Sequence, residues 1–143
     1  MRFHRKKLRI ADCGLRISFT LGLSKVNAEE MKRRTRTFAL RVIKLVESLP
    51  NTPTARVIGN QLLRCATSVG ANYRAASRAR SNADFIAKMG IVEEEADESA
   101  YWIEMLIDTN LVKAALVTEL LDESNQIVAI VVSSINTARN RKR

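Results

Sequence analysis

Carboxylate side chains gather in the second half of the chain, where they could hold a metal or transfer a proton. Five of them fall within six residues: Glu93, Glu94, Glu95, Asp97 and Glu98. Glu94 and Glu98 are four residues apart and share one helical face, as the carboxylates of di-iron bundles do. Such a centre also needs Glu-x-x-His pairs on facing helices, and His4 is the only histidine. The sequence therefore predicts neither a metal site nor a cofactor.

Nucleophilic catalysis and phosphate binding find no better support. His4 lies far from the region expected to fold, so Ser-His and Cys-His dyads are not available there. A phosphate-binding loop needs clustered glycines, whereas Gly59, Gly70 and Gly90 lie singly within expected helices, where they permit close helix approach. We therefore expect that the protein is not an enzyme.

A polar stripe repeats at helical spacing in the middle of the chain: Gln61, Arg64, Ser68 and Asn72. If the next helix folds back near Arg80, Arg64 comes level with Asp97 and Glu98. An interhelical ion pair would then satisfy both charges. We interpret the stripe as one that sets helix register and packing, with a binding role as the alternative.

Two adjacent aromatic residues follow the acidic run. Tyr101 and Trp102 could stack on nucleic-acid bases. Aromatic residues make up only 5% of the chain, so we expect these two to anchor the core or a subunit interface instead.

Four helices are predicted to position these residues. Apolar spacing places them at about 31–49, about 53–79, 81 to about 110, and about 114–138. The start signals are capping residues and a proline: Asn27 with Glu30, Thr52 with Pro53, and Ser81 with Asp84.

Each helix has an apolar face that must be buried. The residues expected in the core include Met31, Phe38, Val42, Leu45 and Leu49; Ile58, Leu62, Cys65, Val69, Asn72 and Ala76; Phe85, Met89, Val92, Ala96, Ile103 and Leu106; and Leu116, Leu120, Ile127, Val131 and Ile135. Short connections between amphipathic helices favour an all-α fold, an antiparallel up-down-up-down four-helix bundle. The composition agrees, because the chain has 46% hydrophobic residues and only 2 prolines and 5 glycines.

We expect a single domain. It should span residues 31–138 and be followed by a basic tail at 139–143. Residues 1–30 are interpreted as a disordered basic tail or a mis-assigned start, because the tripeptide Leu-Arg-Ile occurs twice there without sustained apolar periodicity. The hypothesis is that the natural chain starts at Met31.

Positive charge is concentrated at the ends of the chain. The net charge is +8 over residues 1–36, −3 over 37–138 and +4 over 139–143. Up-down-up-down topology brings the first and third helix starts together with the second and fourth helix ends. Eleven cations would converge there, with only Asp84 nearby to oppose them: Lys32, Arg33, Arg34, Arg36, Arg74, Arg78, Arg80, Arg139, Arg141, Lys142 and Arg143. Such a cluster attracts RNA or DNA, although solvated basic tails are an equally open interpretation.

The remaining composition suggests a cellular setting. Cys13 and Cys65 are too few for a disulfide framework, which favours a reduced, cytoplasmic context. The longest aliphatic run, 127–132, is far shorter than the roughly 20 residues that cross a bilayer, so no membrane partner is expected.

The segment from Gln61 to Asn72 resembles the "four helix bundle protein" family, which includes proteins encoded in intervening sequences of bacterial large-subunit ribosomal RNA genes. The resemblance covers about residues 32–138. Its matching positions are Gln61, Arg64, Ser68, Ala71, Asn72, Ser81, Phe85 and Glu98, with Asp84 replacing the more usual Glu. The family's frequent Glu-Gly-x-Gly-Arg stretch is here Ala75-Ala76-Ser77-Arg78-Ala79, so any role of that Glu or of those glycines does not carry over.

The resemblance implies a homo-oligomer, since family members form ring-like pentamers. It also implies distant kinship with basic accessory proteins of diversity-generating retroelements, which engage nucleic acid and a reverse transcriptase. It implies no defined activity. We expect a non-enzymatic homopentamer that binds RNA or DNA through its basic end. The alternative is a homo-oligomeric scaffold that meets an unidentified protein partner and has no nucleic-acid role.

Overall fold

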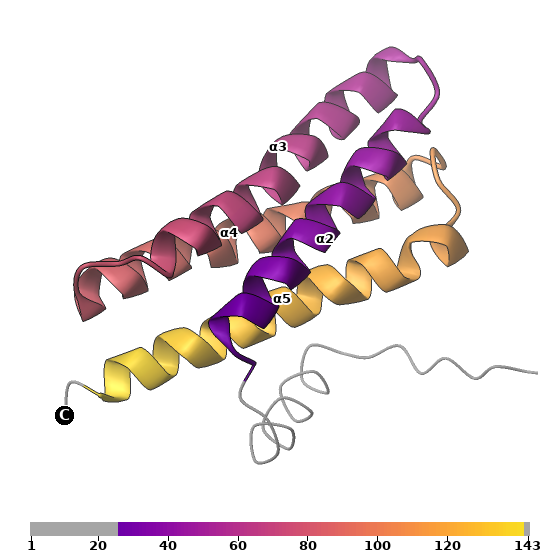
Figure 1. The fold of residues 1–143 in the computed structure, drawn as a ribbon. Helices are drawn as coiled ribbons and strands as arrows, with labels where there is room; N and C mark the ends of the chain where they lie inside the picture. The colour runs from indigo at the N-terminus through magenta and orange to yellow at the C-terminus, as the bar shows by residue number, and fades with distance from the viewer. Residues whose placement is uncertain (1–25, 142–143) are drawn as a thin grey trace, which may run out of the picture.

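The computed structural model describes residues 26–141, and this part of the chain forms four helices and no strand (Figure 1). They are α2 (Ala28–Glu47), α3 (Pro53–Ala76), α4 (Asn82–Asp108) and α5 (Ala114–Asn140). Each helix packs against the next one along the chain, and α2 also contacts α5. The predicted all-α antiparallel four-helix bundle is confirmed. The interpretations of residues 1–25 and of the last two residues lie outside the described part.

The helix bounds differ from the prediction by a few residues. Helix α2 begins at Ala28, three residues before Met31, and α5 continues to Asn140, two residues beyond 138. Helix α3 ends at Ala76 and not at Ala79, because the chain turns through Ser77 before α4. These shifts leave the number, order and direction of the helices unchanged.

Three helices begin at the capping residues that the sequence predicts. The Asn27 side chain accepts a hydrogen bond from the Glu30 N–H at 2.8 Å, and Ser81 accepts one from the Asp84 N–H at 3.0 Å. Thr52 accepts from the Ala55 N–H at 3.2 Å. Each bond satisfies an N–H group that has no partner within its helix, which favours a helix start at that point.

The turn into α5 is built differently. Lys113 precedes this helix and makes no side-chain cap. Asn110 adopts a positive φ of 56°, and the N–H groups of Leu111 and Val112 both donate to the Leu106 carbonyl, at 3.0 and 3.2 Å. The end of α4, more than the start of α5, therefore fixes this connection.

The core contains most of the predicted residues. Ten large ones are essentially inaccessible: Phe38, Val42, Leu62, Val69, Met89, Val92, Ile103, Leu106, Ile127 and Val131. Leu45, Leu49 and Phe85 are only partly buried against them. A continuous apolar core thus runs along the bundle and supplies most of its stabilisation.

Two predicted core residues were wrong. Leu116 is 77% exposed and Val117 is buried in its place, because the turn before α5 sets the rotation of its first residues. Asn72 is half-buried and Tyr73 takes the core position, where the aromatic ring removes more apolar surface from water.

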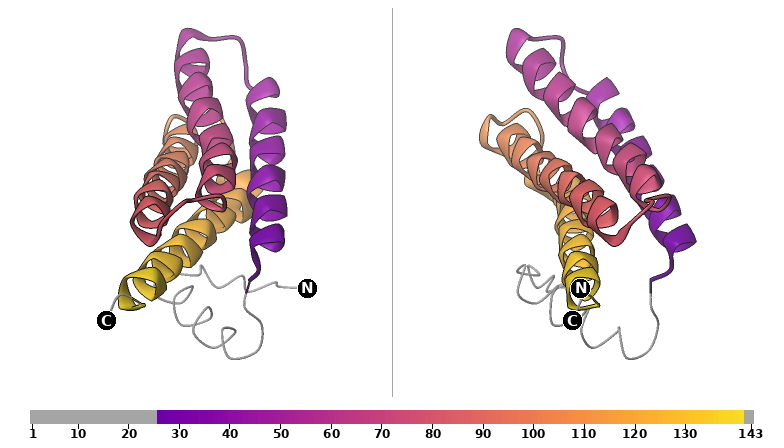
Figure 2. Two further views of the ribbon diagram at one scale, coloured as in Figure 1. Left: turned by 60° about the vertical axis from the view of Figure 1, so that its left-hand side comes forward. Right: turned by 90° about the vertical axis from the view of Figure 1, so that its left-hand side faces the viewer.

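The predicted convergence of helix ends is also found. The Asn82 side-chain amide at the start of α4 donates to the Ala138 carbonyl near the end of α5 at 2.9 Å. Near the end of α3, burial raises the pKa of the Tyr73 hydroxyl. The charge of Glu29 in the first turn of α2 raises this pKa further, so the start of α2 lies near the end of α3. Figure 2 (left) shows α2 and α4 on two sides of the bundle with α3 between them, and these two helices make no contact.

Candidate nucleic-acid interface

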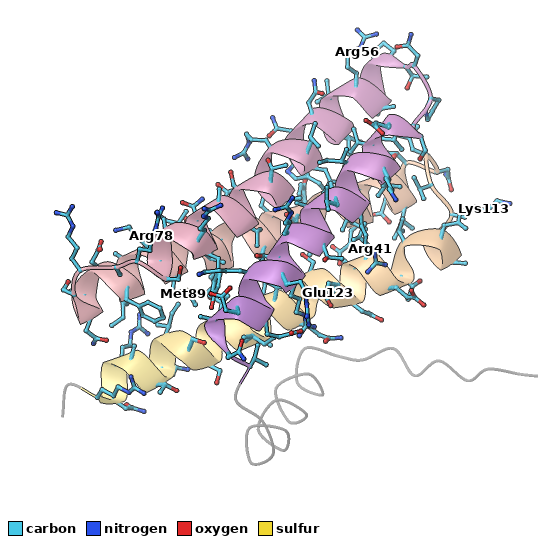
Figure 3. All side chains as sticks on the ribbon, in the orientation of Figure 1. Arg41, Arg56, Arg78, Met89, Lys113 and Glu123 are labelled. Carbon is cyan, nitrogen blue, oxygen red and sulfur yellow. The ribbon has the colours of Figure 1, made fainter. Side chains whose placement is uncertain are left out.

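Five of the predicted cations are exposed at the end of the bundle where α3 meets α4 and α5 finishes. Arg74 lies in the last turn of α3 and Arg139 in the last turn of α5. The others, Arg78, Arg80 and Arg141, lie just beyond those helix ends. Figure 3 labels Arg78 at this end and Arg56 and Lys113 at the opposite end. We call Arg74, Arg78, Arg80, Arg139 and Arg141 the basic end.

Four members of the basic end make no side-chain hydrogen bond or ion pair to any residue between 26 and 141. They are Arg74, Arg78, Arg139 and Arg141. Arg80 differs in two ways: its backbone N–H donates to the Asp84 carboxylate at 3.2 Å, and its charge helps to lower the pKa of Asp84. The Lys88 ammonium and then this N–H hold the pKa of Asp84 below its ordinary value. Asp84 is therefore engaged mainly by Lys88, which leaves the basic end strongly positive.

The cations of α2 are less available than predicted. Lys32 pairs with Glu29 at 2.8 Å, and Arg33 pairs with Glu30. The expectation that only Asp84 opposes the cationic cluster was therefore wrong, because the first turn of α2 carries its own carboxylates. Arg36 remains exposed on the outer side of α2, whereas Lys142 and Arg143 lie beyond the described residues.

Arg34 links α2 to α5. Its guanidinium donates to Glu123 on α5 at 2.9 Å and to the Gln126 side chain at 2.6 Å. Both members of the Arg34–Glu123 pair are largely shielded from water, with side-chain exposures of 23% and 19%. Arg34 thus joins α2 to α5 at a place where its charge is already neutralised.

Arg64 of the polar stripe reaches α4, as predicted. Arg64 donates to Glu98 at 2.6 Å, and its second contact is Glu95 at 3.5 Å. The Arg64–Glu98 pair is therefore confirmed, whereas the proposed pairing with Asp97 was wrong. Glu95 and Glu98 are three residues apart on one face of α4, and Asp97 lies about 100° around the helix from Glu98 and is exposed.

The other members of the stripe make hydrogen bonds within α3. Gln61 accepts a hydrogen bond from Arg64 at 3.4 Å, and the Asn72 amide donates to the Ser68 carbonyl at 2.9 Å. On α4 the Trp102 indole N–H donates to Glu98 at 3.1 Å. Arg64 is therefore the member of the stripe that joins α3 to α4, and its ion pairs favour the register interpretation at this position.

A buried thiol lies at the contact between α3 and α4. Cys65 is inaccessible, and the Ser99 hydroxyl donates to the Glu95 carbonyl at 2.7 Å with the Cys65 sulfur 3.2 Å away. Burial raises the pKa of the Cys65 thiol, so it stays protonated and unreactive at neutral pH. Over residues 26–141, no three His, Cys, Asp or Glu side chains gather as metal ligands would.

The Glu98 carboxylate predicts a pH-dependent contribution to stability. The Trp102 indole and the Arg64 guanidinium lower its pKa, so folding favours its ionised form. That contribution is present above the ordinary carboxyl pKa and disappears as the pH falls through the lowered pKa. Glu98→Gln should destabilise the protein at pH 7 by about 0.5–1 kcal/mol, the range for a largely exposed pair. Urea unfolding at pH 7 and at about pH 3 should show a difference that closes in acid.

The control for this effect is Glu94→Gln, an exposed carboxylate on the same helix with no ion pair to the described residues. It should leave stability unchanged at both pH values. An equal destabilisation by Glu94→Gln, or a Glu98→Gln effect that persists in acid, would contradict the role given to the Arg64–Glu98 pair.

Sequence reasoning missed the carboxylates that neutralise part of the cationic cluster. The i to i+3 spacing of Glu29 with Lys32 and of Glu30 with Arg33 was visible in the sequence. Glu123 could not be found in this way, because its pairing with Arg34 depends on how α2 and α5 are rotated toward each other.

The fold and its charges define a small helical bundle with one basic end. The chain belongs to the 23S rRNA-intervening sequence protein family, whose family model matches residues 28–133. A similar solved structure is a protein of unknown function from the S23 ribosomal protein family of Bacteroides thetaiotaomicron. It is 36% identical, with a TM-score of 0.71 over 76% of this chain and 97% of that chain. No curated protein matches the chain. Within the described residues, no helix is long and apolar enough to cross a membrane.

Proposed function

We propose that this protein is a non-enzymatic, cytoplasmic homo-oligomer that binds RNA or DNA through the basic end. The observation that carries the proposal is the group of exposed arginines without partners in the described chain at one end of the bundle: Arg74, Arg78, Arg139 and Arg141. They come from two different helix ends and face solvent together with Arg80. Guanidinium groups pair with phosphate oxygens in a two-point geometry, so such a group suits a nucleic-acid backbone.

The same geometry limits the kind of recognition. All five members of the basic end are arginines, whose guanidinium groups pair with phosphate oxygens, so phosphate contacts would dominate over base contacts. Binding should therefore depend little on sequence. In a ring of subunits facing one way, the homopentamer that the family resemblance implies, the basic ends would form one continuous surface.

The experiment is a fluorescence-anisotropy titration of the full chain against a structured RNA, a single-stranded DNA and a duplex DNA, repeated at several salt concentrations. Each phosphate contact contributes about −0.9 to the slope of log K against log salt for duplex DNA, so four available arginines predict a slope of about −4 or steeper. The strongest ligand of the three identifies the preferred nucleic acid. Absence of binding at low salt would overturn the proposal and favour the protein-scaffold alternative.

A further inference from the structure

The outer side of α2 carries an exposed leucine between two cations. Leu40 is 50% exposed, although it lies on a helix whose inner face already fills the core. Arg36 and Lys44 are four residues before and after it, so all three lie in one stripe along the helix. Neither cation pairs with any residue of the described chain.

The outer side of α4 carries the opposite arrangement. Tyr101 is 50% exposed, with Asp97 four residues before it and Glu104 three residues after it. Neither carboxylate has a partner within residues 26–141. Helix α4 as a whole has eight acidic residues and one basic residue, so this stripe lies in a negative field.

The two stripes match in length and in order. The cations of α2 are separated by about 12 Å along the helix axis and the carboxylates of α4 by about 10.5 Å, at 1.5 Å per residue. Each pair has an apolar side chain between its members. A parallel or antiparallel approach of the two stripes would therefore place charge against opposite charge and Leu40 against Tyr101.

The stripes cannot meet within one molecule. Helices α2 and α4 make no contact and lie on different sides of the bundle with α3 between them (Figure 2, left). The contact joins two different surfaces, so each copy would use its α2 stripe on one neighbour and its α4 stripe on another. Association of this kind is head to tail, and it forms a ring where the rotation between neighbouring copies closes.

We propose that α2 of one copy, through Arg36, Leu40 and Lys44, docks on α4 of the next copy, through Asp97, Tyr101 and Glu104. The inference rests on the proposed self-association and deepens it by naming its two surfaces. Charge complementarity identifies a second copy as the occupant, because the same chain supplies both members of the match. It also gives Arg36 and Asp97, which have no partner within the described part of a single copy, a role between subunits.

The test is a charge exchange across the proposed interface, followed by sedimentation velocity of the full chain. Lys44→Glu, Glu104→Lys and Asp97→Lys should each weaken association at least about tenfold, because each places like charges opposite each other. One double variant should restore it, since the exchanged charges would again oppose each other. Lys44→Glu with Glu104→Lys does so if the stripes run parallel, and Lys44→Glu with Asp97→Lys does so if they run antiparallel.

The matched control is Lys113→Glu, which makes the same charge change at a helix end outside both stripes. It should associate like the parent chain. Circular dichroism should show that all variants remain folded, since the changed residues are exposed.

Three outcomes would overturn the proposal: a parent chain that stays monomeric, single variants that associate normally, or two double variants that are both no better than the single ones. Nucleic-acid binding is measured on the same samples. Loss of association with retained binding by the basic end separates failure of this interface from failure of the proposed function.

Discussion

Replacing Arg74 and Arg78 by glutamate together is expected to weaken nucleic-acid binding about 60-fold at 0.1 M salt. When one phosphate contact is lost, about 0.9 fewer counterions are released on binding. At that salt concentration this lowers the affinity about eightfold. Two lost contacts therefore multiply to about 60-fold, and the salt slope should become shallower by about 2 for duplex DNA. Anisotropy titrations of parent and variant across salt concentrations measure both quantities.

The matched control is the double variant Arg56→Glu, Lys113→Glu, which makes the same change in net charge at the opposite end of the bundle (Figure 3). It should lose far less affinity, because those side chains are distant from the basic end. Equal losses in both variants would show that binding follows total charge and not the basic end. Neither Arg74 nor Arg78 has a side-chain partner in the described structure, so thermal stability should change little.

Phe38→Ala is expected to cost about 3–5 kcal/mol of folding free energy, the largest effect we expect from a single substitution on stability. Phe38 is completely inaccessible and lies on α2 in the main core cluster. Its removal loses the free energy gained by transferring the aromatic ring out of water. It also leaves a cavity that the neighbouring helices fill only in part. Urea unfolding followed by circular dichroism, at one fixed protein concentration, measures the loss.

Thr37→Ala on the same helix is the control, because Thr37 is exposed and belongs to neither stripe of the proposed interface. Its effect should stay within about 0.5 kcal/mol. A Phe38→Ala loss below about 1 kcal/mol would fall under the range for a buried aromatic ring and would mean that α2 contributes little to the cooperative core. That result would be consistent with the limited packing between α2 and α5 and would make α2 a peripheral helix.

Sequence patterns predicted the helices well because their determinants are local. Asn27, Thr52 and Ser81 cap the helices that they precede, and these bonds depend on residues three positions away. The position of Phe38 in the core follows from helical periodicity alone. Helix starts and buried faces can therefore be predicted from a few turns of one helix, without knowledge of the neighbouring helices.

Errors arose where the rotation of a helix decides the outcome. Val117 and not Leu116 is buried, because the irregular turn after α4 sets how α5 enters the bundle. Glu95 and not Asp97 joins Arg64, because the face that α4 presents to α3 is fixed by packing over its whole length.

The candidate site was predicted less completely than the fold. The sequence placed a cationic cluster at one end, and the structure brings Arg74 and Arg78 there beside the end of α5. The sequence did not reveal that Glu123 neutralises the charge of Arg34, since the two residues are 89 positions apart in the chain. Available charge, as distinct from total charge, can be counted only once the tertiary ion pairs are known.

Trp102, the only tryptophan of the chain, donates its indole N–H to Glu98 on the seam between α3 and α4. Indole emission responds to the polarity and hydrogen bonding around the ring, so the unlabelled protein carries its own fluorescent reporter of that seam. Separation of α3 from α4 would shift the emission wavelength, while fraying of α2 would leave it constant. Emission and circular dichroism recorded together would thus distinguish one cooperative unfolding event from stepwise loss of helices.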